Sequence, residues 1–216
     1  FGHEGVMASS LPVAVMLCPT IAPADVEAFA TRLQQDGVGA LDAPMSGGPL
    51  RARDGSMSLM VAAPDALFER YAAVLQTLSS RLFLVGTRIG DGARTKLVNN
   101  LLASINLAGA AEAMALAQSV GLDAQLTLDV IEQSSGQSWI GSDRMRRALV
   151  GDLAPRAHMA LLRKDSALAL AMAAQHGVTN LTVGAHAAAL FERACQAGLA
   201  DADDASLLPF LRPPAP

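Results

Sequence analysis

Three short segments of the chain combine residue types that can bind or act on a small acid. In the first, residues 42–55 (DAPMSGGPLRARDG), two adjacent glycines let successive backbone N–H groups turn into one concavity, which suits an anion. Ser46 precedes Gly47 and Gly48 and adds a hydroxyl donor. Spacing alone leaves a second interpretation equally open, in which this segment is an ordinary glycine-rich turn.

The second segment, residues 86–100 (GTRIGDGARTKLVNN), opens a predicted helix with glycines. Gly90 and Gly92 do not form a G-x-G-x-x-G fingerprint, because position 95 is a threonine, and the segment does not match a P-loop either. Lys96 and Asn100 are four residues apart and share a helix face, where they can converge on one small molecule. A lysine in an enclosed, partly apolar site loses its proton readily and can act as an acid or a base near neutral pH.

The third segment, residues 163–169 (RKDSALA), lies in a helix rich in alanine and leucine and places Lys164 beside Asp165, where the lysine can reach a cofactor. Both lysines also have a simpler interpretation as solvated surface groups, which is favoured for Lys96 as well as for Lys164 when each segment is taken by itself. For Lys96, the pair Asn99 and Asn100 argues against that interpretation. Asparagine is unfavourable inside an otherwise apolar helix, so two of them need hydrogen-bond partners or a functional role.

Composition excludes several classes of protein. With 51% hydrophobic and 17% charged residues, the 216-residue chain can bury a large core and is not a disordered chain. Sixteen lysines and arginines against twenty acidic residues give a net charge of −4, which argues against a nucleic-acid partner. Two cysteines, far apart, and four histidines without metal-binding spacing predict no metal site and no disulfide framework.

The same features bear on localisation. A chain without a disulfide framework is most simply assigned to a reduced, cytoplasmic compartment. The most apolar run, residues 101–117, contains Asn106 and Glu112. Polar groups are costly at the centre of a membrane, so we predict a helix buried within protein and no membrane partner.

The elements that position the three segments change character near residue 90. Before that point, short apolar runs alternate with helical patterns, and Asp65 is available as the cap of the second helix. Alternation of this kind predicts βαβ units and a largely parallel sheet. The predicted strands are residues 12–17, 38–41, 56–62 and 82–85, and the predicted helices are residues 24–35 and 64–78.

Beyond residue 92 no strand-like alternation appears. Trp139, the only tryptophan, lies in a polar interruption between helices, either as a core aromatic or as the lining of a pocket. We therefore predict an α/β domain over residues 1–89, an all-helical domain over 90–208 and a frayed tail over 209–216. The predicted helices are residues 93–121, 124–133, 142–150, 157–176 and 184–197.

In this order and spacing, the segments resemble the β-hydroxyacid dehydrogenase family, which includes 3-hydroxyisobutyrate, tartronate semialdehyde and L-threonate dehydrogenases. DAPMSGG resembles the family's substrate-binding segment, with Met45 where valine is commoner, and GDGARTKLVNN resembles its catalytic segment. KD at 164–165 resembles its cofactor-binding motif, and CPTIAP at 18–23 resembles the segment whose threonine approaches the nicotinamide. GQSWIGSDRM and GDLAPRAHMALLRKD are most similar to the threonate dehydrogenase-like branch, and GLADADDASLL resembles the family's ending.

The resemblance implies reversible hydride transfer between a nicotinamide ring and the hydroxyl-bearing carbon of a small hydroxy acid. By this resemblance Lys96 is the proton carrier, and Asn100 hydrogen-bonds the substrate. The substrate carboxylate is held by Ser46 and by the N–H groups of Gly47 and Gly48. This assignment is chemically consistent, because an anionic group needs clustered donors and an alkoxide-like oxygen needs a nearby proton carrier.

The resemblance also implies a cofactor and an assembly. Thr20 and Lys164 would contact NAD or NADP, and the protein would form a homodimer or a homotetramer. The implied fold is a remnant of a Rossmann-type nucleotide-binding domain, because this sequence does not contain the glycine-rich turn that holds the dinucleotide pyrophosphate in the family. The residue that separates NAD from NADP lies in that part of the family fold, so the preference stays open. We expect the 216-residue chain by itself to bind the dinucleotide weakly.

Two further interpretations compete with this one. In the first, residues 93–208 form a non-catalytic helical module for oligomerisation, and the motifs are inherited without activity. In the second, the chain is a phosphogluconate-type dehydrogenase, which would use a similar lysine and asparagine. We rank the second lower, because the helical part is short and the match to the smaller hydroxyacid enzymes is fuller.

Overall fold

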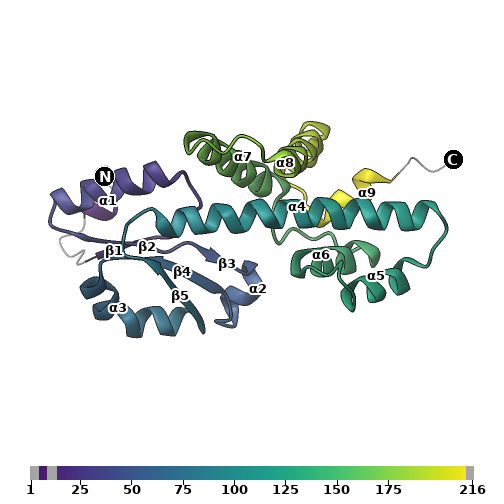
Figure 1. The fold of residues 1–216 in the computed structure, drawn as a ribbon. Coiled ribbons are helices and arrows are strands. Elements are labelled where there is room, and N and C mark those ends of the chain that lie inside the picture. The colour runs from purple at the N-terminus through teal and green to yellow at the C-terminus, as the bar shows by residue number, and fades with distance from the viewer. Residues whose placement is uncertain (1–4, 9–13, 213–216) are drawn as a thin grey trace. The chain divides into compact units, whose positions relative to one another are not determined.

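The computed structural model describes residues 5–8 and 14–212 of the chain (Figure 1). They divide between Val98 and Asn99 into two compact units, each described here by itself. The first unit contains a sheet with helices and the second is helical, which confirms the predicted Rossmann-type α/β part followed by an all-helical part. The division falls inside helix α4 (Asp91–Ser119), whose first two turns belong to the first unit.

Five short strands form the sheet of the first unit. β1 (Ala14–Leu17) pairs in parallel with β2 (Gly39–Asp42), and β4 (Ser58–Ala62) pairs in parallel with β5 (Arg81–Gly86). β3 (Met45–Ser46) and the last residue of β2 both pair antiparallel with β4, along the edge opposite β5. The sheet is therefore mixed: its two longest pairings, β1 with β2 and β4 with β5, are parallel as predicted, and the short pairings of β4 with β2 and with β3 are antiparallel. Only the short helix α2 (Gly48–Arg53) connects β3 to β4, in place of the long crossover that a parallel pair requires.

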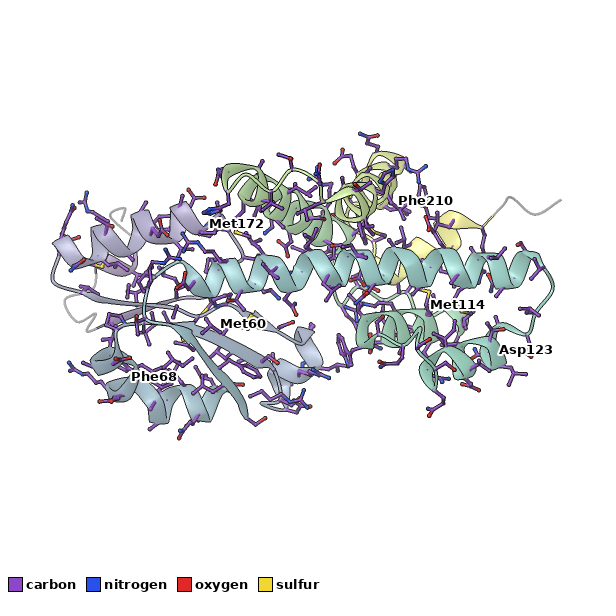
Figure 2. The ribbon with its side chains drawn as sticks, in the orientation of Figure 1. Met60, Phe68, Met114, Asp123, Met172 and Phe210 are labelled. Atoms are coloured by element: carbon purple, nitrogen blue, oxygen red, sulfur yellow. The ribbon has the colours of Figure 1, made fainter. Side chains whose placement is uncertain are left out.

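Helices α1 (Pro23–Gln35) and α3 (Asp65–Leu78) cover opposite faces of this sheet (Figure 1). Successive residues of a strand point to opposite faces. Leu59 and Val61 of β4 accordingly pack with Leu75 of α3 in one buried cluster, while Met60 between them points the other way (Figure 2). β4 is buried on both faces, so its alternate side chains pack against the helices on the two sides of the sheet.

Two details of the first unit differ from the sequence predictions. The predicted Asp65 cap of α3 is wrong: Pro64 occupies the N-cap position, and Asp65 is the first helical residue. A carboxylate in the first turn still interacts favourably with the helix dipole. The glycine-rich segment is also more ordered than a loop, because it contains β3 and the short helix α2 (Gly48–Arg53). Residues 12 and 13 of the predicted first strand lie outside the described residues.

In the second unit, helix α4 is central. α5 (Ala124–Glu132) and α6 (Trp139–Leu149) lie on one side of it, and α7 (Met159–Gln175) and α8 (Thr182–Ala194) lie on the other (Figure 1). The core contains fully buried residues from several of these helices, among them Leu107, Met114, Met145, Met159 and Phe191. Of the described helices, only α4 is long and apolar enough to cross a membrane, and 44% of its most apolar window is buried in the protein.

Helix α6 begins earlier than predicted. Its N-cap is Ser138, whose hydroxyl oxygen accepts a hydrogen bond from the Gly141 N–H at 3.1 Å. Trp139 is therefore the first residue of a helix, and its placement in a polar interruption is wrong. It is 47% exposed, so the interpretation as a core aromatic is wrong as well.

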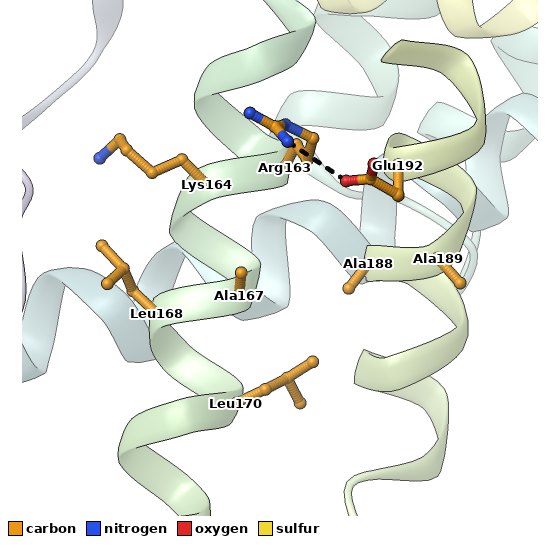
Figure 3. Close-up of a pocket in the computed structure, with 8 residues that line it drawn as sticks. All are labelled: Arg163, Lys164, Ala167, Leu168, Leu170, Ala188, Ala189 and Glu192. Carbon is orange, nitrogen blue, oxygen red and sulfur yellow. Dashed lines mark hydrogen bonds and ion pairs between the residues drawn. The ribbon is translucent and has the colours of Figure 1, made fainter. Parts of the chain in front are cut away.

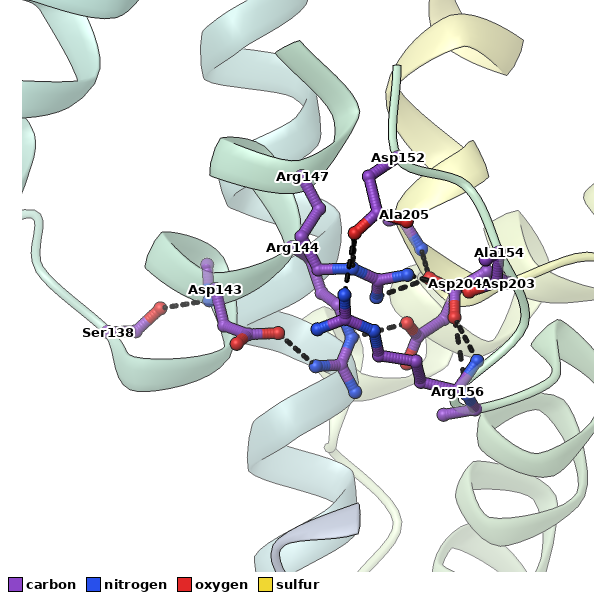
Figure 4. Close-up of polar contacts among 12 residues, drawn as sticks. Ser138, Asp143, Arg144, Arg147, Asp152, Ala154, Arg156, Asp203, Asp204 and Ala205 are labelled. Carbon is purple, nitrogen blue, oxygen red and sulfur yellow. Dashed lines mark hydrogen bonds and ion pairs between the residues drawn. The ribbon is translucent and has the colours of Figure 1, made fainter. Parts of the chain in front are cut away.

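After α8 the chain continues through a π-helical turn (Cys195–Leu199), a 3₁₀ turn (Asp204–Ser206) and helix α9 (Leu207–Leu211), none of which was predicted as a separate element. Buried ion pairs fasten this ending to α6 (Figure 4). Arg147 donates to Asp203 at 2.9 Å, and Arg144 donates to Asp204. All four side chains are buried. The aspartates of the family-like ending therefore have a structural role. Residues 213–216 of the predicted tail lie outside the described part.

Candidate active site

The anion-binding turn predicted from the sequence lies where β3 ends and α2 begins. Gly47 and Gly48 both have positive φ angles, 133° and 69°, a region that side chains other than glycine rarely adopt. A Cβ atom on Gly47 would also lie 2.8 Å from the side chain of Arg51. The two glycines are therefore required by the backbone, and Ser46 directly precedes them. The first N–H groups of α2 have no partner within the helix, as in any helix N-terminus.

Lys96 lies in the second turn of α4 and is only 7% exposed. Its neighbours Ala93 and Leu97 are buried as well. The alternative in which Lys96 is a solvated surface lysine is therefore wrong. A lysine enclosed in this way is able to act as an acid or a base.

In the second unit, Asp165 of α7 joins two of the predicted site residues. Its Oδ2 atom accepts a hydrogen bond from Nδ2 of Asn100 at 2.6 Å, and its Oδ1 atom binds Nζ of Lys164 at 2.7 Å. Asn99 donates to Oδ1 of Asn100 at 2.9 Å. An ionised carboxylate only accepts hydrogen bonds, so Asp165 fixes which end of the Asn100 amide faces it.

Asn100, Lys164 and Asp165 differ in how far they are exposed to solvent. Asn100 and Asp165 are 8% and 5% exposed, whereas the Lys164 side chain is 41% exposed. Asp165 is thus not on the solvated side of an amphipathic helix, and the solvated interpretation of the Lys164–Asp165 pair is wrong for the aspartate. Sequence reasoning left Asp165 without a role. The available signal was a carboxylate inside an otherwise apolar helix, which needs a buried partner.

Thr20 lies in the loop between β1 and α1, at the carboxyl end of a strand that pairs in parallel with β2. It is half-buried. In open α/β sheets ligands bind in the loops that follow the carboxyl ends of the strands. The position of Thr20 therefore suits a dinucleotide.

An open groove lies between α7 and α8 in the second unit (Figure 3). Its volume is about 550 Å³, and Lys164 and Leu168 contribute to one wall. Arg163 and Glu192 form an ion pair across it at 3.3 Å. Within residues 5–8 and 14–212, no group of three or more histidine, cysteine or acidic side chains is placed to hold a metal ion.

The chain is similar to known proteins over both of its units. Residues 90–211, more than half of the chain, match the family model described as the NAD-binding domain of NADP-dependent 3-hydroxyisobutyrate dehydrogenase. The chain belongs to the 3-hydroxyisobutyrate dehydrogenase-type family of β-hydroxyacid dehydrogenases. Residues 2–86 match the model of the NAD-binding domain of 6-phosphogluconate dehydrogenase. The resemblance inferred from the motifs is therefore confirmed.

Individual β-hydroxyacid dehydrogenases are similar over most of the chain. An L-threonate dehydrogenase of Escherichia coli O6:H1 is 36% identical over 209 residues, which are 96% of this chain and 69% of that protein. A 3-hydroxyisobutyrate dehydrogenase of Pseudomonas aeruginosa is 35% identical, over 91% of this chain and 68% of that protein. The crystal structure of a 3-hydroxyisobutyrate dehydrogenase from Salmonella typhimurium matches with a TM-score of 0.87 and 33% identity, over 93% of this chain and 70% of that one.

Membership of this family establishes the reaction class. The protein is an oxidoreductase that transfers a hydride between NAD or NADP and a small hydroxy acid. These relatives are dehydrogenases, which favours the enzyme over the non-catalytic helical module. The match of the helical part to the 3-hydroxyisobutyrate dehydrogenase model favours a small hydroxy acid over a phosphogluconate-type substrate.

Proposed function

We propose that Lys96 is the proton carrier of this dehydrogenase and that Asn100 orients the substrate beside it. The observation that carries this proposal is the burial of both side chains one turn apart on α4, where Asp165 fixes the Asn100 amide. Residues four apart on a helix share one face, so both groups point to the same side of α4. An acid–base group must lie within hydrogen-bond reach of the proton it moves.

The reaction divides between the cofactor and the chain's own residues. NAD or NADP, when bound, accepts the hydride from the hydroxyl-bearing carbon or returns it to the carbonyl carbon. During oxidation Lys96 takes the hydroxyl proton, and during reduction it gives the proton back to the carbonyl oxygen. One N–H of the Asn100 amide is used by Asp165, and we assign the second N–H to the same substrate oxygen.

The carboxylate end of the substrate is assigned to the turn at the start of α2. Ser46 supplies a hydroxyl donor, and Gly47 and Gly48 supply backbone N–H groups. Their positive φ angles, which open this backbone, support the assignment. Hydrogen bonds to an ionised acceptor are about twice as strong as neutral ones, so this turn selects acids over neutral alcohols.

Thr20 and Lys164 are the residues we assign to the cofactor. The loop position of Thr20 at the carboxyl end of β1 fits a dinucleotide, and the half-exposed ammonium group of Lys164 fits a polar or anionic group of it. Asp165 limits the freedom of that ammonium group, which lowers the entropy lost on binding.

The substrate we propose is an acid of the threonate type, because the relative at 36% identity is an L-threonate dehydrogenase. The experiment is a screen of L-threonate, 3-hydroxyisobutyrate and tartronate semialdehyde with NAD and with NADP, using the protein as its gene encodes it. We expect kcat/KM to be highest for L-threonate. A higher value for another acid would overturn the substrate assignment, and turnover of none would overturn the function.

A prediction tests the role of Asp165. Asp165→Asn keeps an acceptor for the Asn100 amide but removes the charge that holds Lys164. We expect Kd for NAD(P) to rise about 10-fold, in line with the loss of one charge-assisted contact worth about 1.5–3 kcal/mol. Asp165→Ala removes both contacts, so kcat should fall as well. Isothermal titration and steady-state kinetics measure the two effects, and equal behaviour of both variants would contradict the assignment.

We further propose that the protein is cytoplasmic and forms a homodimer or a homotetramer. Supporting the assembly, α4 carries Leu102 and Leu116, which are 58% and 63% exposed, and Val120 directly after it is 62% exposed. Exposed apolar side chains of this size are frequent in subunit interfaces. Light scattering of the wild-type protein should give a dimer or tetramer mass, and Leu116→Glu should lower that mass. A monomeric wild-type protein would exclude the assembly.

A further inference from the structure

Asp42 is a buried carboxylate that the mechanism above does not use. It is the last residue of β2 and is only 1% exposed. Its Oδ2 atom accepts hydrogen bonds from the N–H groups of Gly90 at 2.9 Å and Ala93 at 3.0 Å. Both donors lie at the N-terminus of α4, 48 and 51 residues further along the chain. The carboxylate therefore satisfies N–H groups that have no partner within their own helix.

The glycines of the GDG sequence are explained by this contact. A Cβ atom on Gly92 would lie 2.8 Å from both Cγ and the backbone oxygen of Asp42, so a side chain at this position would displace the strand or the carboxylate. Gly90 has a φ angle of 96°, which brings its N–H to the carboxylate. Both glycines thus belong to the contact with Asp42. They let an internal anion approach the helix end.

Burial and the hydrogen bonds shift the pKa of Asp42 in opposite directions, and the net result is a raised pKa. Burial raises the pKa of Asp42, and the hydrogen bonds from the Ala93, Gly90 and Gly92 N–H groups oppose that rise. The positive end of the α4 dipole also favours an anion at this place. The second oxygen, Oδ1, is buried without a hydrogen-bond partner, so the anchoring depends on Oδ2.

Asp42 also begins the segment that carries the substrate turn. Ser46 follows it by four residues, and the backbone between them runs along β4 through the pairing of Met45 with Leu59. One continuous segment of the first unit therefore carries the anion turn at one end and contacts the start of α4 at the other. Lys96 follows Ala93 by three residues, so it lies one helical turn beyond the anchored N–H.

We propose that Asp42 is a positioning residue for Lys96: its carboxylate fixes the first turn of α4 and thereby the place of the Lys96 amine relative to the substrate turn. The inference rests on the proposed role of Lys96. Asp42 itself touches neither substrate nor cofactor in this account.

The test is a double-mutant cycle on kcat with Asp42→Asn, Lys96→Ala and the double variant. We expect Asp42→Asn alone to lower kcat about 10- to 100-fold, since a displacement of about 1 Å is enough for such a loss. In the Lys96→Ala background the same change should have almost no effect, because the group that Asp42 positions is gone. A general loss of structure would lower kcat in both backgrounds.

The matched control is Asp123→Asn. Asp123 caps α5 by accepting the Leu126 N–H at 2.8 Å, and α5 carries no proposed site residue (Figure 2). This variant should leave kcat unchanged. If Asp42→Asn does not fold, Gly92→Ala takes its place in the cycle, because its new methyl group displaces the carboxylate without removing it.

The outcomes separate the two proposals. Additive effects of Asp42→Asn and Lys96→Ala overturn the positioning role of Asp42, and so does an unchanged kcat in Asp42→Asn. An unchanged kcat in Lys96→Ala overturns the role of Lys96 itself, whatever Asp42→Asn does.

Discussion

The Lys96→Ala enzyme should turn over its hydroxy acid about 10²–10⁴ times more slowly than the wild type, with an unchanged Kd for NAD(P). The loss is expected in kcat, because a proton carrier acts on the developing alkoxide charge in the transition state and contributes little to ground-state binding. Lys96 is buried and one turn from Asn100 on α4, and the only other lysine in the sequence, Lys164, is on α7 and is assigned to the cofactor.

Two companion variants sharpen this test. Lys96→Arg keeps a positive charge but cannot give up its proton near neutral pH, so its kcat should be as low as that of Lys96→Ala. Substantial activity in Lys96→Arg would indicate that charge alone is needed. Val98→Ala changes a side chain that is 62% exposed on the same helix, and its kcat should equal that of the wild type. Stopped-flow measurement of nicotinamide absorbance provides the rates, and undiminished turnover in Lys96→Ala would remove Lys96 from the mechanism.

The Asp203→Ala variant should lose about 3–5 kcal/mol of unfolding free energy, the usual cost of leaving a buried charge without its partner. Asp203 is fully buried and binds Arg147, and its other oxygen accepts the N–H groups of Arg156 at 2.6 Å and Ala157 at 3.2 Å (Figure 4). Its removal also frees the ending of the chain from α6. Urea unfolding measures the loss. Asp129→Ala, which breaks an exposed pair with Arg146, should cost less than about 1 kcal/mol.

The same residue gives a pH dependence with a defined sign. Burial by itself would raise the pKa of Asp203, but the hydrogen bonds from Arg156, Ala205, Arg147 and Ala157 outweigh it and hold the pKa below its ordinary value. The stability that Asp203 contributes is therefore present above about pH 4 and is lost as the pH falls through the lowered pKa. This loss on acidification should be absent in Asp203→Asn. An equally steep loss in that variant would assign the acid sensitivity to other groups.

Asp204 acts in the opposite direction. Burial raises its pKa to about 6, against the attraction of Arg144. The folded protein therefore binds a proton at Asp204 that the unfolded chain has released, so this group lowers stability as the pH rises from about 4 to 6. The two neighbouring aspartates together place the stability optimum of this cluster in the mildly acidic range.

Local patterns predict most helices of this protein well. The helix over 24–35 and the helix over 124–133 match α1 and α5 within one residue at each end, because apolar residues at helical spacing and a terminal glycine or cap mark them locally. No local sequence pattern predicts which strands of the sheet pair in parallel and which pair antiparallel. β4 is an apolar run whether its neighbour runs parallel or antiparallel, and the direction follows only from how the chain turns after β3.

The candidate site also contains residues that the sequence identifies and residues that only the structure identifies. Lys96, Asn100 and the Ser46–Gly48 turn are recognisable in the sequence, because their spacing and residue types are local. Asp165 and Asp42 are ordinary carboxylates in the sequence, and their partners are 65 and 48 residues away. Only the structure shows that one fixes an amide and the other holds a helix end.

The order of the elements and the glycine positions were therefore determined by the sequence itself, since each depends on residues within one or two helical turns of each other. The family follows from the sequence as well, through the order and spacing of several such local motifs. Tertiary structure decided which polar groups are buried and what they bind, including Asp42, Asp165 and Asp203. The physical reason is that burial is set by residues distant in the chain, and an unpaired buried carboxylate is too costly to keep without the donors that only folding brings to it.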